Sequence, residues 1–77
     1  MDKLTKKFYE VEAGVPVSID SLTDSELMKL VSMLRRQGHE LAICFKFERG
    51  KDGSRKLRRY LVLREVGCGD VLRNEQA

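Results

Sequence analysis

The side chains that could take part in acid–base, nucleophilic or metal chemistry are few in this sequence. It has one histidine, His39, and two cysteines, Cys44 and Cys68, in 77 residues. A histidine that acts as a general base needs a nucleophile and a group that orients its ring, and the sequence names neither. Zinc ligands usually occur in closely spaced pairs, a spacing that these residues and Asp70 lack. We therefore predict that the protein is not an enzyme and holds no metal or other cofactor.

The two cysteines are expected to be reduced. Residues 1–7 lack the apolar core of a signal peptide. The longest apolar run, Leu41–Phe45, has five residues, whereas a membrane-spanning helix needs about twenty. These features predict a cytoplasmic protein with no membrane partner, and disulfides are rare in the cytoplasm.

A glycine-containing segment, residues 50–54, invites comparison with a phosphate-binding loop. The spacing of such loops is absent, and no helix is expected to follow. The segment reads Gly-Lys-Asp-Gly-Ser, which is typical of a hairpin turn.

Binding chemistry is concentrated around that turn. Residues 49–59 contain six Lys or Arg and one Asp, although the formal charge of the whole chain is only +3. A basic patch on a nearly neutral body suits docking on an anionic surface. The same composition is typical of a hairpin tip that charge keeps soluble, and charge alone does not separate the two interpretations.

The clearest element that could position this patch is a helix between Thr23 and Gly38. Thr23 and Glu26 have the spacing of a capping box, and Gly38 can take the left-handed conformation that ends a helix. The apolar residues between them recur with helical period and indicate a face that packs on a core: Leu27, Leu30, Val31 and Leu34.

After the helix the apolar period changes to two. Alternation from Leu41 to Phe47 indicates a half-buried strand, and residues 56–66 are expected to return beside it. A turn centred on Asp52 places Phe47 opposite Leu57, whereas a slip of one residue would exchange the two faces. We favour the first register because it collects seven large apolar residues opposite the helix: Leu41, Ile43, Phe45, Phe47, Leu57, Leu61 and Leu63.

In that register the second face of the hairpin mixes aliphatic, basic and aromatic side chains. One helix cannot cover both faces of a sheet, so this face is expected to be open to water or to a partner. Its composition is enriched at interaction sites, although an ordinary solvated face is the alternative. The residues on it would be Ala42, Cys44, Lys46, Arg58, Tyr60, Val62 and Arg64.

Residues 7–13 also alternate and predict a third strand, with Tyr9 and Val11 pointing inward. The expected fold is α+β: one domain over residues 1–77, in the order β-α-β-β. One helix would pack on a three-stranded sheet with a basic C-terminal hairpin. We expect order from about residue 6 to residue 67, with residues 70–77 frayed.

These features predict a non-enzymatic module that docks through the basic hairpin on nucleic acid or a nucleoprotein. Basic side chains would contact phosphates, and Tyr60 would stack on a base. The alternative is a protein-interaction module that inhibits or regulates a larger machine, such as a nucleic-acid-processing one, by analogy with small phage or mobile-element accessory proteins. A homodimer is compatible with both, because so short a chain has a small core. The expected binding residues are Lys46, Arg49, Lys51, Arg55, Lys56, Arg58, Arg59, Tyr60 and Arg64.

Overall fold

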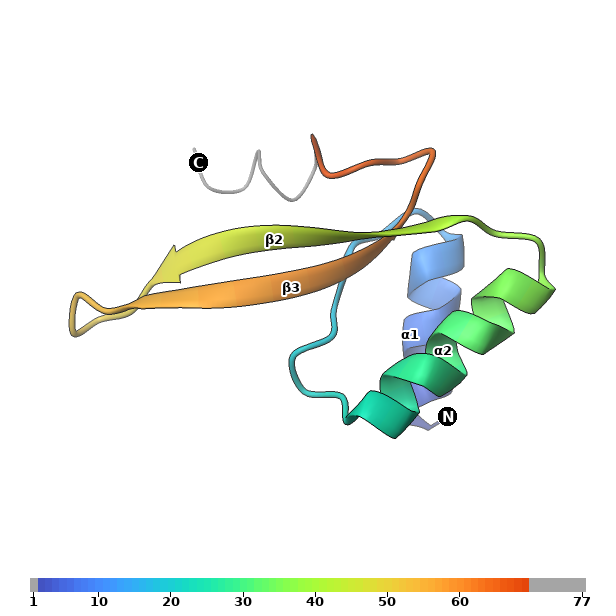
Figure 1. The fold of residues 1–77 in the computed structure, drawn as a ribbon, viewed down its shortest axis with the longest axis horizontal. Helices are drawn as coiled ribbons and strands as arrows, with labels where there is room; N and C mark the ends of the chain where they lie inside the picture. Colours follow the sequence, from blue (N-terminus) through green and yellow to red (C-terminus); the bar gives the residue numbers. More distant parts are fainter. Residues whose placement is uncertain (1, 70–77) are drawn as a thin grey trace.

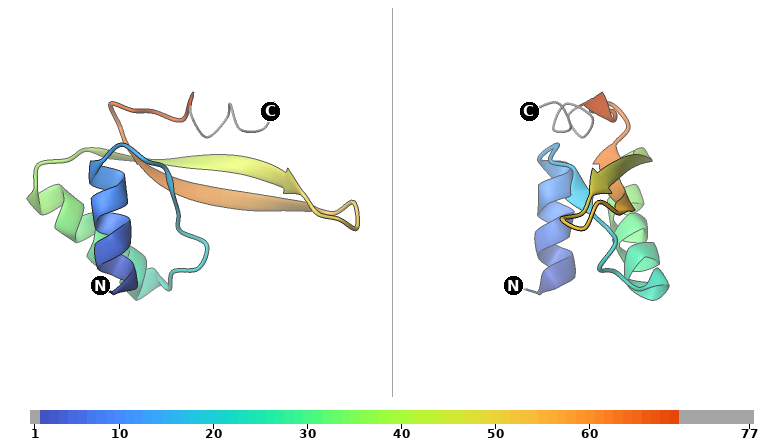
Figure 2. Two further views of the ribbon diagram at one scale, coloured as in Figure 1. Left: turned by 180° about the vertical axis from the view of Figure 1, so that it is seen from behind. Right: turned by 90° about the vertical axis from the view of Figure 1, so that its left-hand side faces the viewer.

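A computed structural model describes residues 2–69 of the chain. The expected fraying of residues 70–77 lies outside this range. Both helices lie against one face of an antiparallel three-stranded sheet, at one of its ends (Figures 1 and 2). The fold is therefore α+β, as predicted, but it has two helices where one was expected. Its elements are α1 (Lys3–Glu12), β1 (Val17–Ser18), α2 (Asp24–Arg36), β2 (Leu41–Arg49) and β3 (Arg55–Leu63).

Helix α1 replaces the strand that was expected over residues 7–13. The carboxylate of Asp2 caps it by accepting a backbone N–H of the first turn at 2.8 Å, a bond that lowers the pKa of Asp2. Leu4, Phe8 and Val11 recur with helical period and pack on the core. Tyr9, which was expected to point inward, is exposed. The strand prediction is wrong because Leu4, which completes the helical stripe, lies outside the window that alternates.

Helix α2 confirms the predicted helix and both of its ends. The Thr23 hydroxyl accepts the Glu26 backbone N–H at 3.2 Å, and the Glu26 carboxylate accepts the Thr23 backbone N–H at 2.9 Å. Gly38 has the left-handed φ of 85°. The expected apolar stripe faces the core, where Leu30 and Leu34 are fully buried.

Removing the capping hydroxyl should weaken the fold by a measurable amount. We expect Thr23→Ala to lower the free energy of unfolding by about 1 kcal/mol, because the backbone N–H of Glu26, in the first turn of α2, loses its hydrogen-bond acceptor. Urea denaturation followed by circular dichroism measures this change. Thr23→Ser keeps the hydroxyl and is the matched control. Equal midpoints for the alanine variant and the wild type would show that the cap contributes nothing.

The third strand, β1, lies between the two helices, where no strand was predicted. Val17 and Ser18 pair antiparallel with Leu61 and Tyr60, so β3 is the central strand of the order β1-β3-β2. Two residues are too few to show a period of two, which is why the pairing could not be read from the sequence. The predicted element order, β-α-β-β, is therefore wrong, and the chain runs α-β-α-β-β.

The predicted register of β2 and β3 is confirmed, with Phe47 opposite Leu57. The turn between the strands is the one expected around Asp52. Its carboxylate accepts the hydroxyl and the backbone N–H of Ser54 at 2.6 and 3.0 Å, which lowers the pKa of Asp52. Local turn chemistry therefore supports the register that the apolar pattern favours.

The β2–β3 hairpin projects beyond both helices (Figure 1). Nine residues in each strand extend about 30 Å, whereas the 13 residues of α2 extend about 20 Å. The molecule is elongated as a result, with dimensions of 40 × 25 × 19 Å. Leu61 and Leu63, at the inner end of the hairpin, enter the core with the helices. We call the outer part, residues 43–57, the hairpin arm.

The chain after β3 folds over the sheet face opposite the helices (Figure 1). There Cys68 forms a disulfide with Cys44 of β2, from which it is separated by 24 residues in the sequence. Cys44 and Val62 are buried, with Ala42 and Tyr60 packed around them. Two predictions are therefore wrong: the cysteines are not reduced, and this face is not fully open. The segment after β3 that covers this face shows no apolar periodicity, so its position could not be predicted from the sequence.

Candidate binding surface of the hairpin arm

The helix-side face of the arm carries large apolar side chains that nothing in the described structure covers. Ile43, Phe45, Phe47 and Leu57 are 44%, 56%, 61% and 48% exposed. Their assignment to the core opposite α2 is wrong, because the arm extends past the helices that would have buried them. Contiguous apolar exposure of this kind marks an interaction surface. We call these four residues the aromatic face.

Arginines border the aromatic face on the same side of the sheet. Arg49 and Arg55 lie opposite each other at its outer end, and Arg59 lies opposite Phe45. The one acidic residue of β2 and β3, Glu48, is on the other face, because side chains alternate along a strand. The aromatic face is therefore apolar with a purely cationic border within the two strands.

The arm also holds the excess positive charge of the chain. It contains five Lys or Arg and two Asp or Glu, which leaves ten of each type in the rest of the sequence. Within residues 2–69, none of the five basic side chains forms an ion pair. They are all among the predicted binding residues: Lys46, Arg49, Lys51, Arg55 and Lys56.

The other basic residues of the predicted set are engaged by carboxylates. These contacts join Arg58 to Glu48 (3.0 Å), Arg59 to Asp20 (3.3 Å) and Arg64 to Glu40 (3.5 Å). Asp20 also accepts the backbone N–H of Arg59 at 3.2 Å. The structure therefore separates the basic residues of the predicted set into five on the arm that form no ion pair in residues 2–69 and three that do.

Tyr60, expected to stack on a base, lies half-buried on the face that the Cys44–Cys68 disulfide covers. Its hydroxyl donates to a Glu48 carboxylate oxygen at 3.2 Å. Burial, followed by the charge of Glu48, raises the pKa of Tyr60. The exposed aromatic rings of the arm are instead Phe45 and Phe47, whose alternation was visible in the sequence but was attributed to the core.

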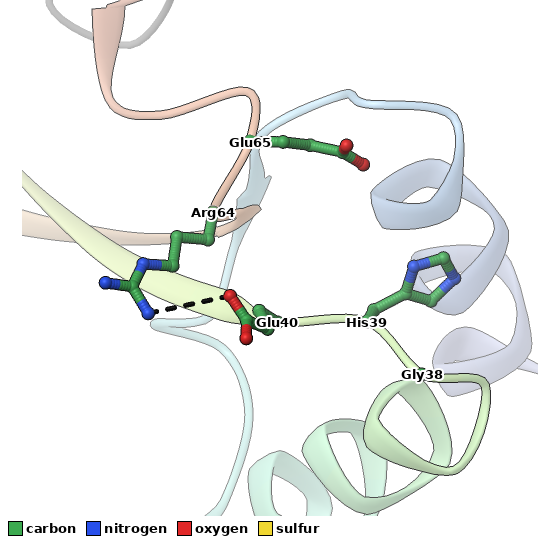
Figure 3. A pocket seen from close by; sticks show the side chains of 5 residues that line it. All are labelled: Gly38, His39, Glu40, Arg64 and Glu65. Atoms are coloured by element: carbon green, nitrogen blue, oxygen red, sulfur yellow. Dashed lines mark ion pairs between the residues drawn. The ribbon is translucent and has the colours of Figure 1, made fainter.

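A hollow of about 380 Å³ lies at the base of the hairpin (Figure 3). Its charged residues are partly engaged: His39 Nε2 lies 3.0 Å from a carboxylate oxygen of Glu12 on α1, and Arg64 pairs with Glu40. A histidine held by a carboxylate resembles the base and its orienting group in a catalytic triad, but no hydroxyl or thiol side chain lines the hollow. The lining residues are Gly38, His39, Glu40, Arg64 and Glu65.

No group of three or more His, Cys, Asp or Glu in residues 2–69 is arranged to hold a metal ion. In the same range, no helix combines the length and apolarity needed to cross a membrane. Comparison with protein-family models, curated proteins and solved structures finds no match to this chain. The arm, with its aromatic face and cationic border, is the surface whose chemistry best fits ligand binding.

Proposed function

We propose that the protein is a non-enzymatic binding module whose hairpin arm binds nucleic acid. The observation that carries this proposal is the position of the five arm cations, which lie on the projecting hairpin and form no ion pair in residues 2–69, with Arg49 and Arg55 on the same face as the exposed aromatic rings. Lys and Arg bind phosphates and release condensed counterions, which makes the affinity strongly dependent on salt. Exposed aromatic rings provide surfaces on which bases can stack.

The shape of the arm supports the same function. A two-stranded ribbon is narrow enough to lie along a nucleic-acid strand or to enter a groove of a duplex. The rest of the sequence has as many acidic as basic residues, so it carries no net charge that would attract an anionic polymer. The arm would therefore make the contacts, and the helices would support it.

Neutralising the outer border of the aromatic face tests this proposal. We expect Arg49→Gln/Arg55→Gln to reduce the slope of log affinity against log salt by about two, because each phosphate contact contributes about one. Fluorescence anisotropy with labelled DNA and RNA, between about 50 and 200 mM salt, measures the slope.

The matched control removes two charges away from the arm. Arg35→Gln/Arg36→Gln changes exposed side chains in the last turn of α2 and should keep the wild-type slope. Equal losses in the two double variants would show that net charge, and not the arm, governs binding. An absence of binding at the lower salt concentration would refute nucleic acid as the ligand.

A protein partner is the second candidate, and the apolar part of the aromatic face favours it. Ile43 and Leu57 add exposed aliphatic area that base stacking does not require. Such a partner would offer an apolar groove with acidic margins, complementary to the arginine border. A polypeptide that co-purifies after nuclease treatment, and is lost with Leu57→Asp, would identify this function.

A further inference from the structure

We infer that the arm binds single-stranded rather than duplex nucleic acid, with two successive bases stacked on Phe45 and Phe47. This inference rests on the proposed nucleic-acid function and names the class of ligand. It differs from binding by phosphate contacts alone, because it requires bases whose faces are accessible.

The spacing of the two rings fits bases taken out of a duplex stack. Phe45 and Phe47 are two positions apart on β2 and point to the same face, so they are about 6.8 Å apart along the strand. Bases within a duplex strand follow one another at about 3.4 Å, and their neighbours cover their faces. An extended single strand separates its bases enough for each ring to take one.

Both rings are free to stack. They are 56% and 61% exposed, and the aromatic contact found in residues 2–69 is elsewhere, between Phe8 and Tyr9 of α1. They stand on a paired strand rather than on a loop, because β3 is hydrogen-bonded to β2 along its full length. A platform held in this way loses little conformational entropy when a ligand binds.

The border residues lie where the phosphates of the same strand would run. Arg49 follows Phe47 by two positions on the same face, and Arg55 is directly opposite Arg49. A strand stacked on the two rings would therefore pass between these guanidinium groups. A duplex could contact the arginines, but its paired bases would leave Phe45 and Phe47 without stacking partners.

Charge argues against a second copy of this chain as the occupant of the aromatic face. Within β2 and β3, this face has arginines and no acidic residue. Two such faces packed together would bring Arg49 and Arg55 to the border without free acidic partners, because the Asp20 carboxylate beside this face already pairs with Arg59. An anionic strand with unpaired bases complements both the rings and their border.

The experiment uses fluorescence anisotropy at low salt to compare the affinities of the protein for three nucleic acids that have the same charge on each phosphate. They are a single strand of about 12 thymidines, within the range of known site sizes, an abasic strand of the same length, and a thymidine–adenosine duplex. Wild-type protein should bind the thymidine strand about 25-fold or more tightly than the abasic strand, since each of the two stacked bases contributes about fivefold or more. Phe45→Ala/Phe47→Ala should bind both single strands as weakly as the wild type binds the abasic one.

Met28→Ala is the matched control. Met28 is an exposed apolar side chain on α2, outside the arm. This variant should therefore keep the preference for thymidines over the abasic strand. Phe45→Trp/Phe47→Trp should also keep it, because the larger rings still stack. Thermal unfolding of each variant shows that it is folded, as expected for changes at exposed positions.

The outcomes separate this inference from the proposed function. Salt-sensitive binding of all three ligands with no effect of the phenylalanine changes would overturn the inference and leave the proposed function standing. Binding of none of them would refute both. A dimer in light scattering that Phe45→Ala/Phe47→Ala dissociates would also overturn the inference, because a second copy would then occupy the aromatic face.

Discussion

Leu34→Ala should lower the free energy of unfolding by about 3 kcal/mol or more. Leu34 is fully buried in the cluster that joins α1 and α2 to the sheet. Truncating a buried leucine costs about 3 kcal/mol or more, through lost transfer free energy and the cavity that remains. A core in a chain of this length supplies only about 3–5 kcal/mol in total. Urea denaturation followed by far-ultraviolet circular dichroism should therefore show a much lower midpoint than that of the wild type.

Two further variants make this result specific. Met28→Ala changes a side chain on the same helix that is 70% exposed, and it should alter the stability by less than about 0.5 kcal/mol. Leu34→Met preserves the buried volume and should cost less than about 1.5 kcal/mol, so its urea midpoint stays measurable. The assignment of Leu34 to the core would fail if Leu34→Ala were no less stable than Met28→Ala.

Features set by residues close in sequence were predictable. The capping-box partners Thr23 and Glu26 are three positions apart, and the turn around Asp52 depends on Ser54, two positions away. The register of β2 and β3 follows from that turn together with the alternating apolar residues. Interactions this local are encoded in a short window, so α2 and the hairpin could be read directly from the sequence.

Features set by residues distant in sequence were not predictable. The acidic partner of Arg59, Asp20, is 39 positions away, and Cys44 and Cys68 are 24 positions apart. No spacing rule connects such residues before the chain is folded. The basic segment could be located from composition, but the arginines already paired with carboxylates could not be separated from those that are not.

The aromatic face shows a third limit of sequence reasoning. Alternation correctly predicted that Phe45 and Phe47 share a face with Leu61 and Leu63. It contained no information on how far the helices would extend along that face. Leu61 and Leu63 lie beneath the helices and are buried, whereas the phenylalanines lie beyond them and are exposed. The candidate site is exposed because the β2–β3 hairpin is longer than the helices that pack against it.

Reduction of the Cys44–Cys68 disulfide should lower the free energy of unfolding by about 3 kcal/mol. The bridge joins two residues that are 24 positions apart. A cross-link of that span reduces the conformational entropy of the unfolded chain, which stabilises the folded state by about 3 kcal/mol. Small domains with limited cores often depend on such bridges. Thermal unfolding with and without a thiol reductant measures the effect, and we expect the melting temperature to fall by about 15 °C.

Cys68→Ala provides the control for the reductant itself. It removes the bridge while leaving Cys44 in its buried position, so its melting temperature should be low and should not change when reductant is added. A wild-type melting temperature that stays constant, with both thiols shown to be reduced, would contradict a stabilising bridge. The disulfide and the aromatic face lie on opposite sides of the sheet. Below the melting temperature, reduction should therefore leave binding by the arm unchanged, which separates the stability of the fold from the chemistry of the binding surface.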